Sequence, residues 1–243
     1  MIMQQNKNFI HTDAKLKKCF SLLVWNLHKE NQTKAFQKQF HSLVQNYQTD
    51  IFLFQEVRYP KKSDFIFKNY SYALAHNIET KKSRFGVLTA TQCSFVLAQP
   101  LLSSKKELGF LTHKSYLLTQ HTIDEETKLT ILNLHAINFV NSKTFAHELQ
   151  EIQKKLLQLK GPLIVAGDFN SWSHKRNKLL ISFQNALGLQ KLTIQNEKKI
   201  KHFLSHKLDH IYYRGIKAKQ ALAIDTKNIS DHNPLYATFE LPS

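Results

Sequence analysis

Apolar residues along the chain come in short runs, each with the length of a buried strand. Two of these runs cover residues 20–25 (FSLLVW) and 50–55 (DIFLFQ). Residues 33–47, between them, place their apolar side chains on one stripe of a helix, at Phe36, Phe40, Leu43, Val44 and Tyr47. A strand, an amphipathic helix and a second strand in close succession predict a crossover unit of a sheet.

The middle of the chain, residues 85–135, has a different pattern. Short β-rich runs follow one another there with polar turns between them, which predicts antiparallel strands with a hairpin turn at residues 124–126. Residues 142–160 then give the clearest helical stripe, and Gly161 and Pro162 end it. Further strands are expected over 162–166, 210–213 and 235–241, and a further helix over 177–186. Two packed sheets with helices outside accommodate this alternation in one domain.

The composition supports a folded protein with a polyanionic partner. The 243 residues are 42% hydrophobic, enough for a sizeable core, and 6 glycines and 5 prolines mark no flexible linker. Lys and Arg number 34 against 18 Asp and Glu, which gives a net charge of +16. This surplus favours nucleic acid or an anionic membrane surface. A lysine-rich genome would give the same surplus, so the charge supports a nucleic-acid substrate without deciding it.

The cysteines and the N-terminus bear on the compartment. Cys19 and Cys93 are isolated, which suits a reducing compartment and argues against a disulfide scaffold or a zinc finger. Residues 1–19 lack the apolar core of a signal peptide, and no run reaches the roughly 18 apolar residues of a membrane span. We therefore expect a cytoplasmic protein without integral membrane association, a loosely ordered segment over 1–19 and one domain over 20–243.

Polar side chains with chemical potential lie at the ends of the predicted strands. They comprise amides, carboxylates and imidazoles: Asn26, Glu56, His135, Asp168, Asn170, Asp209, Asp231 and His232. A single carboxylate at a strand end is usually an ordinary surface residue. The set is more informative, because strand ends that converge on one edge of a sheet are a usual place for an active site.

The donor types in this set indicate a hard metal ion and phosphodiester chemistry. Carboxylate and amide oxygens suit Mg²⁺, whereas zinc is less natural without a nearby cysteine. An Asp–His pair can hold an imidazole oriented and cationic, or make it a base. A metal, a base and donors for phosphoryl oxygens are the parts needed for water to attack a phosphodiester.

In chain order, the strings VWN, FQE, NLH, GDFN, LDHI and SDHNP resemble the motifs of the endonuclease/exonuclease/phosphatase superfamily. That superfamily includes deoxyribonucleases, apurinic/apyrimidinic endonucleases, sphingomyelinases and inositol polyphosphate 5-phosphatases. The match runs over residues 20–241, and the strings HAINF, GDFNSWS, YRG and SDHNPL are similar to a less characterised bacterial branch. The resemblance implies a four-layer α/β/β/α sandwich of two mixed sheets with helices outside.

The resemblance also implies a metal site. Glu56 would hold Mg²⁺, for which Mn²⁺ could substitute, assisted by Asn26 and supported by Asp231.

The catalytic roles that the resemblance implies fall on the remaining motif residues. Asp168 would position or deprotonate the attacking water, and Asn170 would hold a phosphoryl oxygen. His232, oriented by Asp209, would contact the scissile phosphate as a base or a cation. His135 would stabilise the transition state or protonate the leaving oxygen. The choice of general base between Asp168 and His232 stays open.

The sequence departs from the family pattern where substrate contacts are expected. The run FGVLTAT lacks the Ser-Arg ending of many members, and Glu79 is the nearest candidate for a second glutamate beside His135, with Arg84 close by. Arg84 and Lys114 are candidate phosphate contacts, and Trp172 is either a packing residue or a wall on which a base stacks.

We therefore expect a monomeric, metal-dependent phosphodiesterase that acts on DNA or RNA as an endonuclease or exonuclease. A phosphatase or phospholipase C-type hydrolase of phosphoinositides or sphingomyelin is one alternative. A non-catalytic nucleic-acid-binding protein is another, although binding alone does not need Glu56, Asp168 and His232 together.

Overall fold

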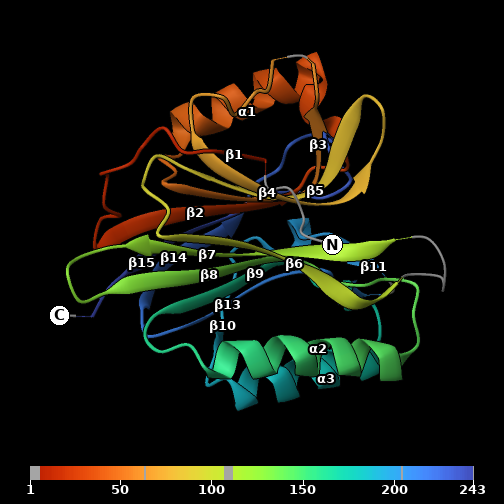
Figure 1. The fold of residues 1–243 in the computed structure, drawn as a ribbon. Helices are drawn as coiled ribbons and strands as arrows, with labels where there is room; N and C mark the ends of the chain where they lie inside the picture. Colours follow the sequence, from red (N-terminus) through yellow and green to blue (C-terminus); the bar gives the residue numbers. More distant parts are fainter. Residues whose placement is uncertain (1–5, 63, 107–111, 204, 243) are drawn as a thin grey trace.

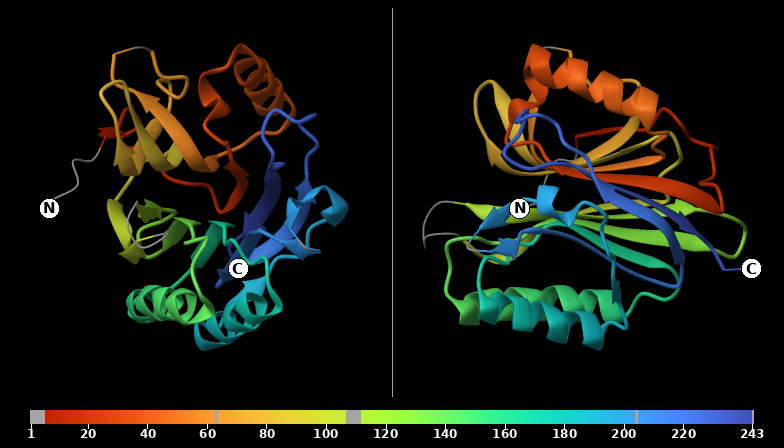
Figure 2. Two further views of the ribbon diagram at one scale, coloured as in Figure 1. Left: turned by 90° about the vertical axis from the view of Figure 1, so that its right-hand side faces the viewer. Right: turned by 180° about the vertical axis from the view of Figure 1, so that it is seen from behind.

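Two β-sheets lie face to face in the computed structural model, and helices cover their outer faces (Figure 1). The structure describes residues 6–62, 64–106, 112–203 and 205–242. Helix α1 (Lys34–Asn46) covers one sheet, and α2 (Ser142–Leu157) and α3 (His174–Ala186) lie side by side on the other (Figure 2). The predicted four-layer sandwich is confirmed.

Each sheet mixes parallel and antiparallel pairs. Within the described residues, seven strands form the first sheet in the order β1 (Asn6–Asn8), β4 (Ser71–Glu79), β5 (Ser83–Thr91), β3 (Ile51–Pro60), β2 (Cys19–Asn26), β15 (Leu235–Glu240) and β14 (Lys217–Ala223). Six described strands form the second, in the order β10 (Gln190–Lys191), β13 (Asp209–Arg214), β9 (Leu163–Asp168), β8 (Lys128–His135), β7 (His113–Thr122) and β6 (Leu97–Lys106). A small hairpin pairs β11 (His202–Phe203) with β12 (His206–Lys207).

The helices begin where side chains cap them and bury the stripes that the sequence predicts. Thr33 accepts the N–H of Phe36 at the start of α1, and Asn141 caps α2 in the same way. Ser173 caps α3, which therefore starts at His174 and not at residue 177 as predicted. Its first turn is polar, so hydrophobic periodicity could not reveal it. In the part of the chain that the structure describes, no helix is both long and apolar enough to cross a membrane.

Two parallel strand pairs place the strand ends together. β2 runs parallel to β3 with α1 as the crossover, and β8 runs parallel to β9 with α2 as the crossover. Antiparallel β13 starts where β9 ends, so that Asp209 pairs in register with Asp168, which in turn pairs with His135. The carboxyl ends of β2, β8 and β9 and the start of β13 thus meet at one edge of the two sheets, next to the middle of β3, which continues past Glu56 to Pro60.

The two sheets are joined just beneath this edge by buried amides. The Gln55 Nε2 donates to the Asn133 Oδ1 at 2.7 Å, and the Asn133 Nδ2 donates to the Leu88 carbonyl at 2.9 Å. Gly167 lets β9 approach β8 closely, since a Cβ on it would lie 2.0 Å from the Leu134 carbonyl oxygen. These contacts fix the positions of the strand ends at the site relative to one another.

The N-terminal stretch, expected to be loosely ordered, makes defined contacts from residue 6 onward. Residues 6–8 form β1 and pair with β4, and Leu16 is buried with its N–H bonded to the Thr122 carbonyl. Residues 1–5 lie outside the described part. This stretch closes one edge of the first sheet, a role that its polar sequence does not signal.

Candidate active site at the strand ends

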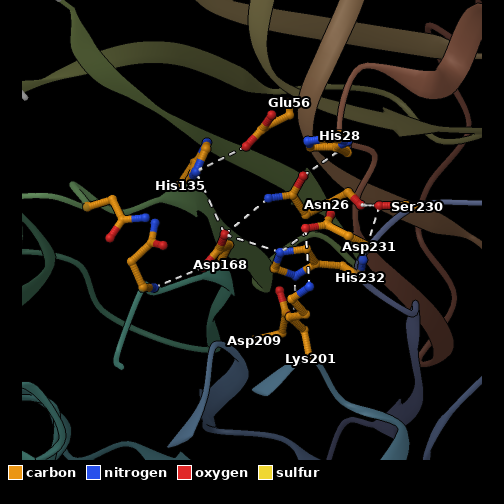
Figure 3. A network of polar contacts seen from close by, with 12 residues as sticks. Asn26, His28, Glu56, His135, Asp168, Lys201, Asp209, Ser230, Asp231 and His232 are labelled. Carbon is orange, nitrogen blue, oxygen red and sulfur yellow. Dashed lines mark hydrogen bonds and ion pairs between the residues drawn. The ribbon is translucent and has the colours of Figure 1, made fainter. Parts of the chain in front are cut away.

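A network of polar side chains occupies the edge where the strand ends meet (Figure 3). The network holds all eight residues that the sequence singled out at strand ends. They come from both sheets and from the loop before β15: Asn26 on β2, Glu56 on β3, His135 on β8, Asp168 on β9, Asn170 just after β9, Asp209 on β13, and Asp231 and His232 before β15.

The centre of the network is a buried chain of two aspartates and a histidine. The His232 Nδ1 lies 2.7 Å from the Asp209 Oδ2, and its Nε2 lies 3.9 Å from the Asp168 Oδ2. All three side chains are less than 10% exposed. The Trp25 indole donates to the His232 carbonyl at 2.8 Å and the Ser230 hydroxyl accepts the His232 N–H, so the backbone of this residue is held as well.

The aspartates around His232 keep its ring protonated. Burial alone lowers the pKa of a histidine, but Asp209, Asp168 and Asp231 outweigh burial and raise the pKa of His232 to about 10. At neutral pH the ring is therefore a cation, with Nδ1 donating to Asp209 and Nε2 directed toward Asp168.

The pKa of Asp168 is raised as well, although a carboxyl group beside a cationic histidine usually has a lowered pKa. Burial, which penalises the ionised form, raises the pKa of Asp168 to about 6; nearby His232 lowers it and Asp209 adds to the rise. Asp168 accepts hydrogen bonds from the Asn26 Nδ2 at 3.1 Å and from the Asn170 N–H at 2.9 Å. The carboxylate is ionised at neutral pH and more basic than an exposed aspartate.

Glu56 reaches the site through a break in strand β3. The register of β3 against β5 shifts between Phe54 and Val57, and Glu56 has a φ of 51°. A non-glycine residue in this left-handed region costs about 1–3 kcal/mol, and bulges of this kind re-aim a side chain. The Glu56 carboxylate lies 3.8 Å from the His135 Nε2 and 3.5 Å from the Lys29 Nζ.

His135 joins Glu56 to the central chain. Its Nε2 lies 3.7 Å from the Asp168 Oδ2 and 3.1 Å from the Lys114 Nζ. Burial, followed by the charges of Lys114 and His232, holds the pKa of His135 well below its ordinary value. A neutral His135 can accept a hydrogen bond from the Lys114 ammonium, which adds a positive group to the Lys29 ammonium beside Glu56 on this side of the site.

The segment after Asp168 is shaped by a residue that the sequence did not single out. Asn170 has a φ of 48°, and its Nδ2 donates to the Ala136 carbonyl at 2.9 Å. The guanidinium of Arg176, only 1% exposed, donates to the carbonyls of Asn170 and Ile137 and also to those of residues 138 and 140. One buried arginine thus joins the loops after β8 and β9. No sequence pattern signals this role, because Arg176 lies in the polar first turn of a helix.

Comparison with known proteins agrees with this geometry. The model of the Endonuclease/Exonuclease/phosphatase family matches residues 23–232. The chain belongs to this family. It is 31% identical to a UPF0294 protein of Erwinia tasmaniensis, over 96% of this chain and 88% of that protein. It is also 31% identical to a UPF0294 protein of Vibrio campbellii, over 91% and 77%. The similarity to a less characterised bacterial branch is confirmed.

Solved structures share the fold at low sequence identity. An endonuclease/exonuclease/phosphatase family protein from Leptotrichia buccalis superposes with a TM-score of 0.70 at 16% identity, over 91% of this chain and 100% of that one. D. rerio TDP2 complexed with a single-strand DNA product gives 0.69 at 16%, over 91% and 99%. The human Nocturnin catalytic domain with bound sulfate gives 0.68 at 17%, over 98% and 97%.

Members of the endonuclease/exonuclease/phosphatase family are hydrolases that typically depend on a divalent metal ion, and the donor set of this site fits such an ion. Ligand atoms of Asp168, Asp209 and His232 lie within 4.8 Å of one another. However, the Asp209–His232 hydrogen bond uses two of these atoms, and a cationic His232 repels a metal. The oxygens of Glu56 and of Asn26, whose amide nitrogen donates to Asp168, are further candidates to hold the ion.

Asp231, the third residue expected at the metal, lies at the edge of the network. Its side chain is 45% exposed, and it lies 3.3 Å from the Lys201 Nζ and 4.0 Å from the His232 Nε2. Partial burial raises its pKa, but His232 and Lys201 outweigh this and lower it. In the described structure the Asp231 carboxylate therefore stabilises the charge of His232, and its described contacts do not include Glu56.

The expected substrate contacts are divided between two places. Arg84 is on β5 and forms an ion pair with Glu79, which also pairs with Lys61 and lies 3.6 Å from the His76 Nε2. The described contacts of Glu79 do not include His135, so Glu79 does not act as a second glutamate beside that histidine. Lys114, by contrast, lies at the site, where its ammonium contacts the His135 ring.

Proposed function

We propose that the protein is a Mg²⁺-dependent phosphodiesterase that hydrolyses nucleic acid, with Mn²⁺ able to replace Mg²⁺. The observation that carries this proposal is the buried Asp209–His232–Asp168 chain beside the re-aimed carboxylate of Glu56. A phosphodiester needs a base for water and positive charge around the phosphoryl oxygens, and this arrangement supplies both. Bound by Glu56 and Asn26, the metal would supply Lewis-acid stabilisation of phosphoryl charge.

In this proposal Asp168 is the general base. A pKa of about 6 leaves Asp168 ionised at neutral pH and close to the range that favours proton transfer. Asp168 takes a proton from water, the water oxygen forms the new P–O bond, and the P–O bond to the leaving group breaks. His232, whose pKa is about 10, is already protonated at neutral pH and so cannot take a proton from water; it acts as a cation on a phosphoryl oxygen.

The remaining residues position and stabilise. Asp209 orients the His232 ring through Nδ1. Asn170 uses one amide hydrogen on Ala136 and has a second for a phosphoryl oxygen. Lys114, held against neutral His135, places positive charge where negative charge develops on the leaving oxygen.

The role of Asp209 predicts a change in pH dependence. The protonated His232 is present below its folded pKa and is lost as the pH rises through about 10, so kcat/KM should fall on the alkaline side there. Asp209→Asn removes a charge that raises this pKa, and the alkaline limb should move down by at least about one pH unit. A pH profile of kcat/KM measures this. Glu240→Gln, an exposed carboxylate paired with Lys219, is the matched control. An unmoved limb in Asp209→Asn would reject the cationic role of His232.

The choice of nucleic acid rests on the net charge of +16 and on the fold shared with TDP2, solved with a single-strand DNA product. A panel of plasmid, abasic-site duplex, single-stranded RNA, phosphoinositide and sphingomyelin tests it, each with Mg²⁺ and with EDTA. We expect DNA or RNA to be cleaved fastest. Affinity for an oligonucleotide should fall at least about tenfold between 50 and 200 mM salt, since each neutralised phosphate releases counterions. Faster cleavage of either lipid would show that the substrate is a headgroup, and no cleavage at all would favour a binding protein.

A further inference from the structure

Beside the catalytic network lies a cavity with aromatic walls. It measures about 360 Å³ and is lined by Asn138, Phe139, Asn170, Trp172, Phe203 and Leu208. Asn170 belongs to both the cavity and the network, and Leu208 immediately precedes Asp209. The cavity is within the about 300–1,000 Å³ range of small-ligand sites, and it opens next to the residues proposed to act on the phosphate.

One wall of the cavity is held rigidly. The Trp172 indole donates to the Asn138 Oδ1 at 2.9 Å, and the Arg176 guanidinium lies 4.6 Å from the Trp172 ring. Arg176 is itself buried and bonded to carbonyls of the two loops that carry Asn138 and Asn170. Because the ring is fixed before any ligand arrives, stacking on it costs little further ordering.

Two phenylalanines that line the cavity are more than half exposed. Phe139 is 66% exposed and Phe203, on the β11–β12 hairpin, is 53% exposed. The Phe203 ring meets Trp172 at an interplanar angle of 78° with 6.4 Å between centroids. Packing against Trp172 leaves Phe203 more than half exposed, and a planar ligand in the cavity would cover both phenylalanines.

The charge next to the cavity is positive. A second cleft, of about 570 Å³, shares Phe139 with the cavity and is lined by Lys105, Lys106 and His113 among others. An aromatic pocket that adjoins a basic cleft matches the alternation of bases and phosphates along a single strand of nucleic acid.

From these observations, and resting on the proposed function, we infer that the Trp172–Phe203 cavity stacks an unpaired nucleobase of the nucleotide next to the scissile phosphate. Stacking on an aromatic face requires a base that has left its own duplex stack. The enzyme should therefore prefer single-stranded or unpaired substrate and read the base by its flat face, with little sequence preference.

Tryptophan fluorescence tests the inference directly, because the chain has only 2 tryptophans and Trp25 is 1% exposed. Catalytically silenced Asp168→Asn protein is titrated with single-stranded hexathymidylate and with a baseless hexamer of equal charge. Hexathymidylate should quench the fluorescence and bind more tightly, whereas the baseless hexamer should bind through its charge without quenching. Trp172→Phe, which leaves Trp25 as the remaining tryptophan, should abolish the quenching.

A second variant separates stacking from folding. Phe203→Ala, on an exposed hairpin, should narrow the affinity ratio between the two hexamers by roughly 5- to 150-fold, the range of one stacking contact. Ile181→Ala, an exposed residue of α3, should leave that ratio unchanged. Equal affinity and equal quenching by the two hexamers would overturn the subsite, even if the wild type cleaves nucleic acid. A stronger response to tyrosine amide than to thymidine would assign the cavity to a peptide side chain and overturn it as well. If no nucleic acid binds or is cleaved, the proposed function fails and the subsite fails with it.

Discussion

Asp168→Asn is expected to lower kcat by about 10²- to 10⁴-fold, the range that a general base contributes, while the protein stays folded. Asparagine keeps the shape of the side chain and can still accept the Asn170 N–H, but it cannot take a proton from water. Because burial raises the pKa of Asp168, its ionised form is costly in the folded protein. The thermal midpoint should therefore not fall by more than a few degrees.

Steady-state kinetics and a thermal melt measure the two effects on one preparation. Asp64→Asn is a matched control, since its carboxylate is 88% exposed and pairs only with Lys68 among the described residues. Turnover near the wild-type value in Asp168→Asn would reject this residue as the base. The double variant with His232→Ala should lose less than the product of the single losses, because groups that act as one unit are non-additive.

Glu56→Gln is expected to raise the Mg²⁺ concentration needed for half-maximal activity, and to lower activity at fixed Mg²⁺ by at least the about 10- to 100-fold that losing an outer-shell partner costs. Glutamine keeps the size of the side chain and removes the charge that a hard cation needs. Glutamine is also a non-glycine residue without a branched Cβ, so the left-handed backbone at residue 56 costs about the same in the variant and the fold should be retained.

A Mg²⁺ titration of activity separates metal binding from chemistry. Glu79→Gln is the control, because Glu79 is a partly exposed glutamate held by Lys61 and Arg84 on the same sheet. Its Mg²⁺ dependence should equal that of the wild type. If Glu56→Gln needs no more Mg²⁺ than the wild type, Glu56 is not a metal ligand and the metal belongs nearer Asp231 or Asp209.

The sequence predicted the layers and the strand ends because both follow from local patterns. The helical stripe over residues 33–47 and the buried run over 163–168 each depend on their own side chains. Strands β4 and β14 were not predicted. β4 mixes small and polar residues with its apolar ones, and β14 contains three alanines, three polar residues and one leucine, so neither shows a strong strand pattern. Each pairs with the next strand along the chain, β4 with β5 and β14 with β15, so the pattern missed the strand itself and not a distant partner.

The site shows the same division. Motif spacing identified Glu56 and Asp168, but not the bulge that turns Glu56 toward His135. Lys114 stood out only as a candidate phosphate contact, and its place beside His135 depends on the pairing of β7 with β8. The electrostatic shifts arise from burial and from charges brought together by folding, so the sequence left the choice between Asp168 and His232 open.

The central claim is that a divalent metal and the residues at the strand ends together hydrolyse a phosphodiester. The most direct measurement follows a single-stranded oligonucleotide with the wild-type protein in Mg²⁺, after EDTA, and after Mg²⁺ is restored in excess. The account predicts cleavage, its loss in EDTA and its return with Mg²⁺, and no such cycle in Asp168→Asn. Undiminished cleavage in EDTA, or equal cleavage by Asp168→Asn, would contradict it.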